Sequence, residues 1–312
     1  IFRISYYGIK CRGSNKNLIT LSDGFRPTFF GYHDKTPFSA DNSKVLAMSI
    51  EASDTEPESE CSSMKLGYFI RNKKGEFEKN FIPFAETTTW CWQQGCMLQW
   101  YPLDANSKVI FNTLVDGAYG SVMFDIDKGY VVRQYKYPIY SVDPTGMLAC
   151  TLNFSRLGRL RPGYGYRLLQ DDTAGEKAPQ DDGLFVFDLK RGKRDLLVSL
   201  ADLAEEAGDS NSQHYVNHAT FAPDGRRIIF FHLWARNKKQ IRLSRTCQLD
   251  PFTGQWSEIE ADRTISHYCW RDGSSFIATT LDKTGKCRYS LYNLSDQTRT
   301  DVWMEDASIA AI

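Results

Sequence analysis

Residues 213–234 read Gln-His-Tyr-Val-Asn-His-Ala-Thr-Phe-Ala-Pro-Asp-Gly-Arg-Arg-Ile-Ile-Phe-Phe-His-Leu-Trp, and they contain the clearest copy of a unit that recurs along the chain. Residues 222–225 form a tight-turn sequence, and residues 227–231 are β-branched and aromatic, as in a strand. The stretch therefore predicts a β-hairpin. Pairing across its turn is expected to bring His218 and His232 together at the open end of the hairpin.

The same hairpin occurs four more times, each copy having a polar turn followed by an apolar strand. These turns lie near residues 39–42, 102–104, 143–146 and 272–273, and a second hairpin with its own turn follows each copy. Four short strands per unit, at intervals of roughly 40 to 80 residues, are typical of β-propeller blades. We therefore predict an all-β chain with a β-propeller fold. A two-sheet sandwich is the alternative, but sandwiches do not repeat an Asp-Gly hairpin in register.

The repeats favour a single propeller domain that spans all 312 residues. Five blades can be assigned, to approximately residues 30–94, 95–139, 140–213, 214–264 and 265–303. A propeller has to close to protect its strand edges. Either the terminal residues 1–29 and 304–312 complete the ring or the sequence is truncated, and we favour truncation.

The composition excludes several classes of partner. Lysine plus arginine equals aspartate plus glutamate at 38 each, so no overall charge indicates nucleic acid or a membrane surface. The apolar runs are too short for a transmembrane helix.

Eight cysteines without a CxxC spacing argue against a zinc ribbon or a disulfide framework. Cys150 and Cys269 lie in predicted strands, where buried free thiols are expected, and this favours a reducing compartment such as the cytoplasm.

Three segments depart from the repeat. Residues 51–60 contain five carboxylates and no base, which predicts a solvated insertion. Residues 153–182 interrupt the third blade, and a long loop in a compact domain is usually functional or disordered. Residues 195–208 predict a short amphipathic helix that ends at a glycine.

Polar side chains gather at the rim of the predicted ring opposite the Asp-Gly turns. All five histidines are assigned to this rim: His33, His214, His218, His232 and His267. Gln94, Asn112, Tyr140 and Asn153 are assigned to the same rim. Neutral imidazoles converging from adjacent blades could bind Zn²⁺ or Mn²⁺, with His218, His232 and His267 as ligands, or imidazolium groups could bind an anion. The sequence leaves both possibilities open.

The insertion in the third blade adds positive charge to this rim. It carries Arg156, Arg159, Arg161 and Arg167 together with Tyr164 and Tyr166, in twelve residues without an acid. Arginine pairs with carboxylate or sulfate, and tyrosine offers a flat face and a hydroxyl, so the combination suits an acidic sugar. Alternatively, the arginines pair with the acidic residues of 171–182 and hold the loop in place.

These residues resemble those of propeller polysaccharide lyases. The Pro-Asp-Gly hairpin with a rim histidine resembles the repeats of oligogalacturonate lyases, and Tyr140 and Arg156 on either side of one turn resemble the tyrosine–arginine pair of ulvan lyases. The resemblance covers about residues 30–303. It implies a seven-bladed propeller that cleaves a uronic-acid-containing polysaccharide by β-elimination.

The resemblance also implies roles for the rim residues. Tyr140 would be the base and acid, Arg156 would assist it, and the histidine trio would hold a metal or the uronate carboxylate. The remaining rim and loop candidates would bind substrate: Gln94, Asn112, Asn153, Arg159, Arg161, Tyr164, Tyr166, His33 and His214. The expected partner is an acidic oligo- or polysaccharide. The alternative is a non-catalytic propeller that binds glycan or protein through the same rim, and an intracellular scaffold of the WD40 kind is a third interpretation.

Overall fold

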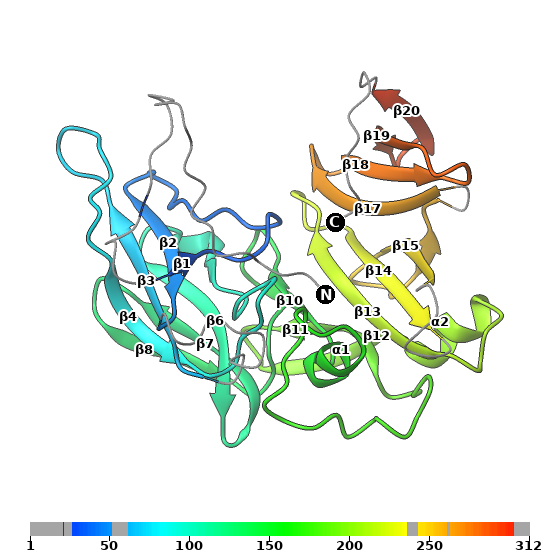
Figure 1. Cartoon of the computed structure of the whole chain (residues 1–312), viewed down its shortest axis with the longest axis horizontal. Helices are drawn as coiled ribbons and strands as arrows, with labels where there is room; N and C mark the ends of the chain where they lie inside the picture. The colour runs from blue at the N-terminus through cyan, green and yellow to red at the C-terminus, as the bar shows by residue number, and fades with distance from the viewer. Residues whose placement is uncertain (1–20, 22–26, 52–61, 236–242, 261–262, 303–312) are drawn as a thin grey trace.

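The computed structural model describes residue 21 and residues 27–51, 62–235, 243–260 and 263–302 (Figure 1). Most of residues 1–29 and all of residues 304–312, which could complete the ring, lie outside the described residues, as does nearly all of the acidic segment 51–60. None of the described helices is long and apolar enough to cross a membrane.

The described residues form five four-stranded antiparallel sheets, taken up one after another along the chain. The first contains β1 (Thr28–Phe29), β2 (Lys44–Ser49), β3 (Met64–Ile70) and β4 (Ile82–Thr87). The second contains β5 (Gln99–Trp100), β6 (Lys108–Val115), β7 (Ala118–Asp125) and β8 (Tyr130–Tyr135). The third contains β9 (Ser141–Val142), β10 (Leu148–Thr151), β11 (Gly183–Asp188) and β12 (Lys193–Ser199).

The last two sheets come from the second half of the chain. The fourth contains β13 (Gln213–Phe221), β14 (Ile228–Ala235), β15 (Leu243–Leu249) and β16 (Trp256–Glu258). The fifth contains β17 (Arg263–Trp270), β18 (Ser275–Asp282), β19 (Cys287–Asn293) and β20 (Thr298–Val302).

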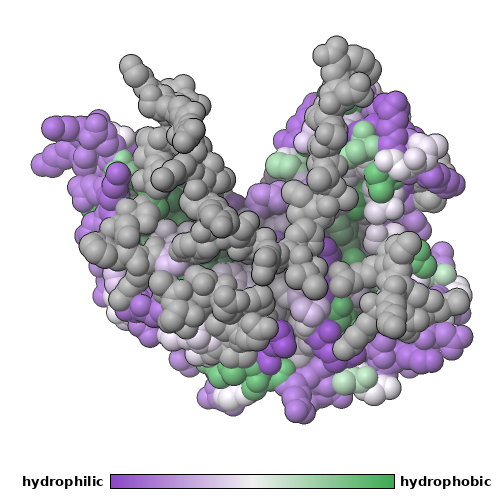
Figure 2. Space-filling view, viewed as in Figure 1, coloured by the Kyte–Doolittle hydropathy of each residue, from purple (hydrophilic) through white to green (hydrophobic). Residues whose placement is uncertain are grey.

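Neighbouring sheets pack face to face through apolar side chains. Leu46 and Met48 of the first sheet share a buried cluster with Val109 and Phe111 of the second, and another cluster joins the third, fourth and fifth sheets. Figure 1 shows the first two sheets on one side of the molecule and the last two on the other, with the third between them. Figure 2 shows polar residues over the outer surfaces of these two arms. The predicted β-propeller class and its repeated four-stranded units are confirmed.

The β13–β14 hairpin forms around the predicted turn, where Gly225 has a φ of 71° that favours glycine. Its register differs from the expected one because a β-bulge lies between Asn217 and Thr220. His232 therefore pairs with Val216, and His218 lies within the bulge at a φ of 53°. The bulge separates His218 from His232, so the expectation that they lie together was wrong.

The described residues contain two short α-helices and one 3-10 turn, at Pro102–Asp104. Helix α1 (Phe154–Leu160) begins the insertion in the third blade, and the Asn153 side chain caps it. Helix α2 (Leu200–Glu206) starts at a capping box formed by Ser199 and Asp202. The helix predicted over 195–208 is therefore only partly correct, because its first residues belong to strand β12. Cys150 is buried as expected, whereas Cys269 is exposed.

Candidate functional site

A pocket of about 230 Å³ lies where the segment after β1 meets strands β13 and β17. Its lining is dominated by aromatic rings and imidazoles, with one carboxylate: Tyr32, His33, Asp34, His218, His267, Tyr268 and Trp270. A cavity of this size can hold about one sugar ring or a comparable small group. The pocket is therefore the candidate functional site.

Tyr32 organises one wall of the pocket. Its ring stacks on His218 at a centroid distance of 4.9 Å and on His267 at 5.9 Å. His33, which is exposed, lies 5.3 Å from the His267 ring. Burial, followed by the charges of Arg161 and the neighbouring histidines, lowers the pKa of His218, and burial together with His33 and Arg161 lowers the pKa of His267. Both rings are therefore neutral near pH 7, so the imidazoles stacked on Tyr32 add no charge to the pocket there.

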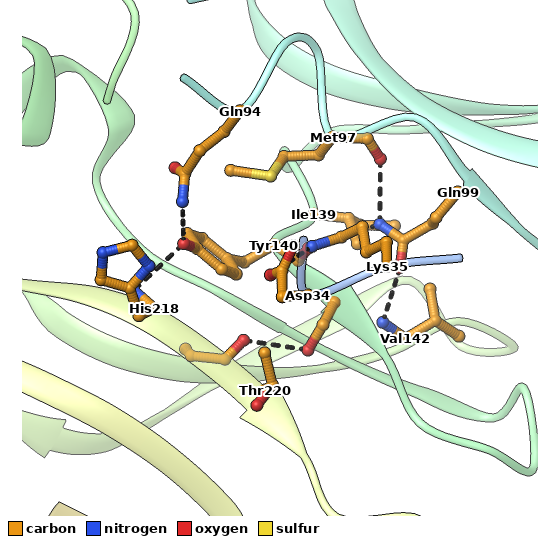
Figure 3. Close-up of polar contacts among 12 residues, drawn as sticks. Asp34, Lys35, Gln94, Met97, Gln99, Ile139, Tyr140, Val142, His218 and Thr220 are labelled. Carbon is orange, nitrogen blue, oxygen red and sulfur yellow. Dashed lines mark hydrogen bonds and ion pairs between the residues drawn. The ribbon is translucent and has the colours of Figure 1, made fainter. Parts of the chain in front are cut away.

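Tyr140 lies at the centre of a buried polar cluster beside the pocket (Figure 3). Its hydroxyl accepts hydrogen bonds from the Gln94 side chain and from the His218 backbone N–H, and it donates to Asn217 Oδ1 at 3.0 Å. Burial, and then the charge of Asp34, raise the pKa of Tyr140 well above its usual range. The hydroxyl is fully occupied and buried, so it holds together the segments around His218.

The backbone of His218 is held from both sides. The Tyr140 hydroxyl accepts from its N–H at 3.1 Å, and the Tyr268 hydroxyl donates to its carbonyl oxygen at 2.7 Å. A non-glycine residue at positive φ is strained, and such strain persists only where surrounding contacts fix it. The two tyrosines supply these contacts and so fix the position of the His218 ring against Tyr32.

His214 and His232 form a separate, fully buried chain of hydrogen bonds within the fourth sheet. Arg245 Nε donates to His232 Nδ1 at 3.1 Å, so the other nitrogen of His232, Nε2, carries its proton and donates to His214 Nδ1 at 2.9 Å. His214 Nε2 then donates to the Asp209 carbonyl oxygen. Both nitrogens of both rings are used inside the protein.

The predicted metal trio is therefore not assembled. His232 has no free nitrogen and lies in the hydrogen-bonded chain, whereas His218 and His267 line the pocket with Tyr32 stacked on each. In the described part of the chain no group of three or more His, Cys, Asp or Glu side chains is arranged to hold a metal ion.

The buried histidine chain predicts an acid-sensitive fold. Burial lowers the pKa of His232 and of His214, so these rings contribute stability that is present above their unfolded pKa of about 6.5 and is lost as the pH falls below it. In wild type the unfolding free energy should fall between pH 7 and pH 5. We expect His232→Gln to make this fall less steep, by up to about 1.4 kcal/mol per pH unit, because the variant lacks one group that binds a proton on unfolding. Urea denaturation at several pH values measures this, with the exposed His33→Gln as control. If the unfolding free energy of His232→Gln and of wild type changed equally with pH, the role of buried His232 in the acid sensitivity would be contradicted.

Arg156 lies in helix α1 of the insertion, away from solvent. The five N–H groups of its guanidinium make six hydrogen-bond contacts, and they reach the backbone carbonyls of Thr173, Glu176, Lys177 and His214 and the side chains of Thr173 and Gln213. Asn153 caps α1 and donates to Asp182, and Arg159 pairs with Asp171 at 2.8 Å and donates to Gln213. The two arginines therefore hold the insertion against β13, and Asn153 holds it together internally.

Other predicted substrate residues also contact protein groups. Asn112 donates to the Ile139 carbonyl and to the Tyr166 hydroxyl, and its oxygen accepts from the Ile139 N–H. Tyr166 is buried with its ring stacked on Phe154 at 4.4 Å. Gln94 is buried and uses its nitrogen on Tyr140, while Gln94 Oε1 has no partner among the described residues.

Arg161 differs from the other arginines of the insertion for which contacts are described. Its guanidinium lies 3.9 Å from the centre of the Tyr164 ring, and its buried Nε has no hydrogen-bond partner in the described residues. The Tyr164 ring in turn meets the edges of Tyr32 and His218. Arg161 is not itself a lining residue, but its charge acts on Tyr32, His218 and His267, which line the pocket, and its Nε donor is unused among the described residues.

Three pocket residues were not predicted from the sequence: Tyr32, Asp34 and Tyr268. Each is next in sequence to a predicted rim histidine, since Tyr32 and Asp34 flank His33 and Tyr268 follows His267. That adjacency was the available signal, but it does not reveal which of the neighbouring side chains faces the pocket.

No protein-family model matches this chain, and no curated protein matches it. Among solved structures, the chain is similar to the putative TolB of Agrobacterium tumefaciens, with 11% identity, a TM-score of 0.46, and coverage of 88% of this chain and 80% of that chain. It is also similar to the β-propeller domain of the Trilobed protease from Pyrococcus furiosus, with 11% identity, a TM-score of 0.48, and coverage of 86% and 68%. A third similar structure is puromycin hydrolase, with 12% identity and a TM-score of 0.43, and 78% of this chain aligns with 33% of that protein.

These similarities correct the family suggested by the sequence. The similar structures are TolB-like or peptidase-associated propellers, among them the tricorn protease and an acylaminoacyl peptidase of Pyrococcus horikoshii. The resemblance to oligogalacturonate and ulvan lyases was therefore wrong. At 8% to 12% identity the similarities concern the fold alone.

Proposed function

We propose that this protein is a glycan-binding β-propeller whose pocket holds an acidic sugar residue of an oligo- or polysaccharide. The observation that carries the proposal is the Arg161 guanidinium, which stacks on Tyr164 next to Tyr32 and His218 of the pocket and whose buried Nε has no hydrogen-bond partner among the described residues. A carboxylate can take two parallel hydrogen bonds from a guanidinium, and a sugar ring can stack on flat aromatic side chains.

The proposal concerns binding and involves no bond cleavage. The polar atoms of Tyr140 and Arg156 are engaged by protein groups, so neither side chain offers a free group to a substrate. The neutral imidazoles and phenols of the pocket provide flat surfaces and hydrogen-bonding groups without fixed charge. Positive charge is then concentrated at Arg161, which would select the carboxylate end of a uronate.

Replacing Arg161 tests the proposal. We expect Arg161→Met to weaken binding of an unsulfated uronate oligosaccharide by about 10- to 100-fold, because a hydrogen-bonded ion pair with a carboxylate is lost. Arg161→Lys should fall between wild type and Arg161→Met, since lysine keeps the charge but loses the fork. Isothermal titration calorimetry measures the affinities.

Two controls make the result specific. Arg191→Met removes an arginine that is 81% exposed in the β11–β12 turn and should leave binding unchanged. A carboxyl-reduced, neutral form of the same oligosaccharide should bind wild type and Arg161→Met equally weakly. Equal affinity of wild type for the acidic and reduced forms would overturn the role of Arg161, and failure of wild type to bind any uronate would overturn the proposed function.

A further inference from the structure

Asp34 leaves one carboxylate oxygen without a partner at the wall of the pocket. Its side chain is 10% exposed, and its Oδ2 pairs with Lys35 Nζ at 2.8 Å. Its Oδ1 is buried and has no hydrogen-bond donor among the described residues. Because a buried, unpaired oxygen of a charged group is costly, we expect a ligand in the pocket to supply the donor that the described residues do not.

The described groups around Asp34 make their hydrogen bonds elsewhere. The Tyr268 hydroxyl donates to the His218 carbonyl, and the Lys35 ammonium pairs with Oδ2 and lies 5.2 Å from the centre of the Tyr140 ring. Figure 3 shows Asp34 and Lys35 beside Tyr140. Asp34 and Thr220 both line the pocket. Asp34 therefore lines the same cavity as the aromatic wall.

We infer that Asp34 is a specificity-determining residue that accepts a hydrogen bond from a free hydroxyl of the bound sugar, and this rests on the function proposed above. An ionised carboxylate only accepts hydrogen bonds, and O–H to carboxylate bonds are short and strong. The same carboxylate repels a second anion placed beside it. The site thus distinguishes the two ends of an acidic sugar, with the carboxylate at Arg161 and a hydroxyl at Asp34.

A sulfate in place of that hydroxyl removes the donor and adds a negative charge beside Asp34. The ligand class that fits is consequently an unsulfated uronate with free hydroxyls. A sulfated uronate should bind more weakly than an unsulfated one. A site that recognised its ligand by positive charge alone would show the opposite preference, because the sulfated form carries more negative charge.

The experiment compares three ligands on wild-type protein by calorimetry: an unsubstituted uronate oligosaccharide, its O-methylated form and its O-sulfated form. We expect O-methylation to weaken binding about tenfold and O-sulfation at least 100-fold. Because the protein is unchanged, these results do not depend on the folding of a variant. Equal or tighter binding of the sulfated form would overturn the role of Asp34.

Asp34→Asn gives the matching change in the protein. The asparagine amide keeps the shape of the side chain and removes its charge, so we expect about tenfold weaker binding of the unsubstituted uronate. The affinities for the unsubstituted and sulfated forms should then differ only a few-fold. Asp127→Asn removes an exposed carboxylate paired with Lys44 and should change neither affinity.

The outcomes separate this inference from the proposed function. If Asp34→Asn and ligand substitution change nothing while Arg161→Met still abolishes uronate binding, Asp34 has no role in specificity and the proposed function stands. If wild type binds no uronate in any form, both are overturned.

Discussion

Arg156→Met is expected to lower the free energy of unfolding by about 4 kcal/mol, because it leaves several buried acceptors without donors. Four backbone carbonyls lose their contact with the guanidinium, and water cannot reach them easily since Arg156 is 1% exposed. The Lys177 carbonyl oxygen still accepts a hydrogen bond from the His214 N–H of β13, whereas the Thr173 and Glu176 carbonyls lose their bonds to Arg156. We therefore expect the segment 173–177 to loosen before the fourth sheet unfolds. Urea denaturation followed by tryptophan fluorescence measures the loss, and limited proteolysis locates it.

Two other arginines calibrate this expectation. Arg159→Met breaks the ion pair with Asp171, but the arginine is 32% exposed, so about 1 kcal/mol is expected. Arg191→Met lies at the surface and should be neutral. If Arg156→Met proved as stable as wild type and lost glycan binding instead, Arg156 would be a ligand residue rather than a support of the insertion.

The propeller could be predicted from sequence because its signals are local. The turn at residues 222–225 and its counterparts mark hairpins through their backbone requirements, and β-branched runs mark the strands between them. The helix over 195–208 was only half correct, since its first residues pair with β11 as strand β12. Pairing with a distant strand overrode the local pattern there.

The site could be predicted only by region. A single bulge after Asn217 moves His218 out of register with His232, and a bulge has no reliable sequence signal. Arg156 was predicted to assist Tyr140 in catalysis, yet carbonyl oxygens, which every residue carries, take up its donors. Arg161 has the same local composition and remains unpaired in the described structure. Which arginine is free depends on the path of the loop.

Tyr140→Phe should lower the unfolding free energy by about 2–3 kcal/mol, because it removes the hydroxyl that links Gln94, Asn217 and the backbone of His218. Gln94 Oε1 and Asn217 Nδ2 already lack partners in the described residues, so these amides have few other ways to satisfy their remaining atoms. Tyr130→Phe, at a tyrosine that is 49% exposed, is the matched control and should be neutral. Uronate binding by Tyr140→Phe should weaken by less than tenfold, because the Tyr140 hydroxyl holds the backbone of His218 in place and does not contact the ligand.

A double-mutant cycle with Tyr268→Phe tests whether the two phenols act together on His218. Tyr140 contacts its N–H and Tyr268 its carbonyl oxygen, so both hold one strained residue, and their losses should not add. We expect a coupling of about 1 kcal/mol, because once one phenol is gone the bulge can relax and the second has less strain to restrain. Strictly additive losses in stability, together with unchanged uronate affinity in the double variant, would show that the positive φ of His218 is set by the β13–β14 bulge alone. A binding loss in the double variant that exceeds the product of the single losses would instead place the tyrosine pair among the groups that position the pocket wall.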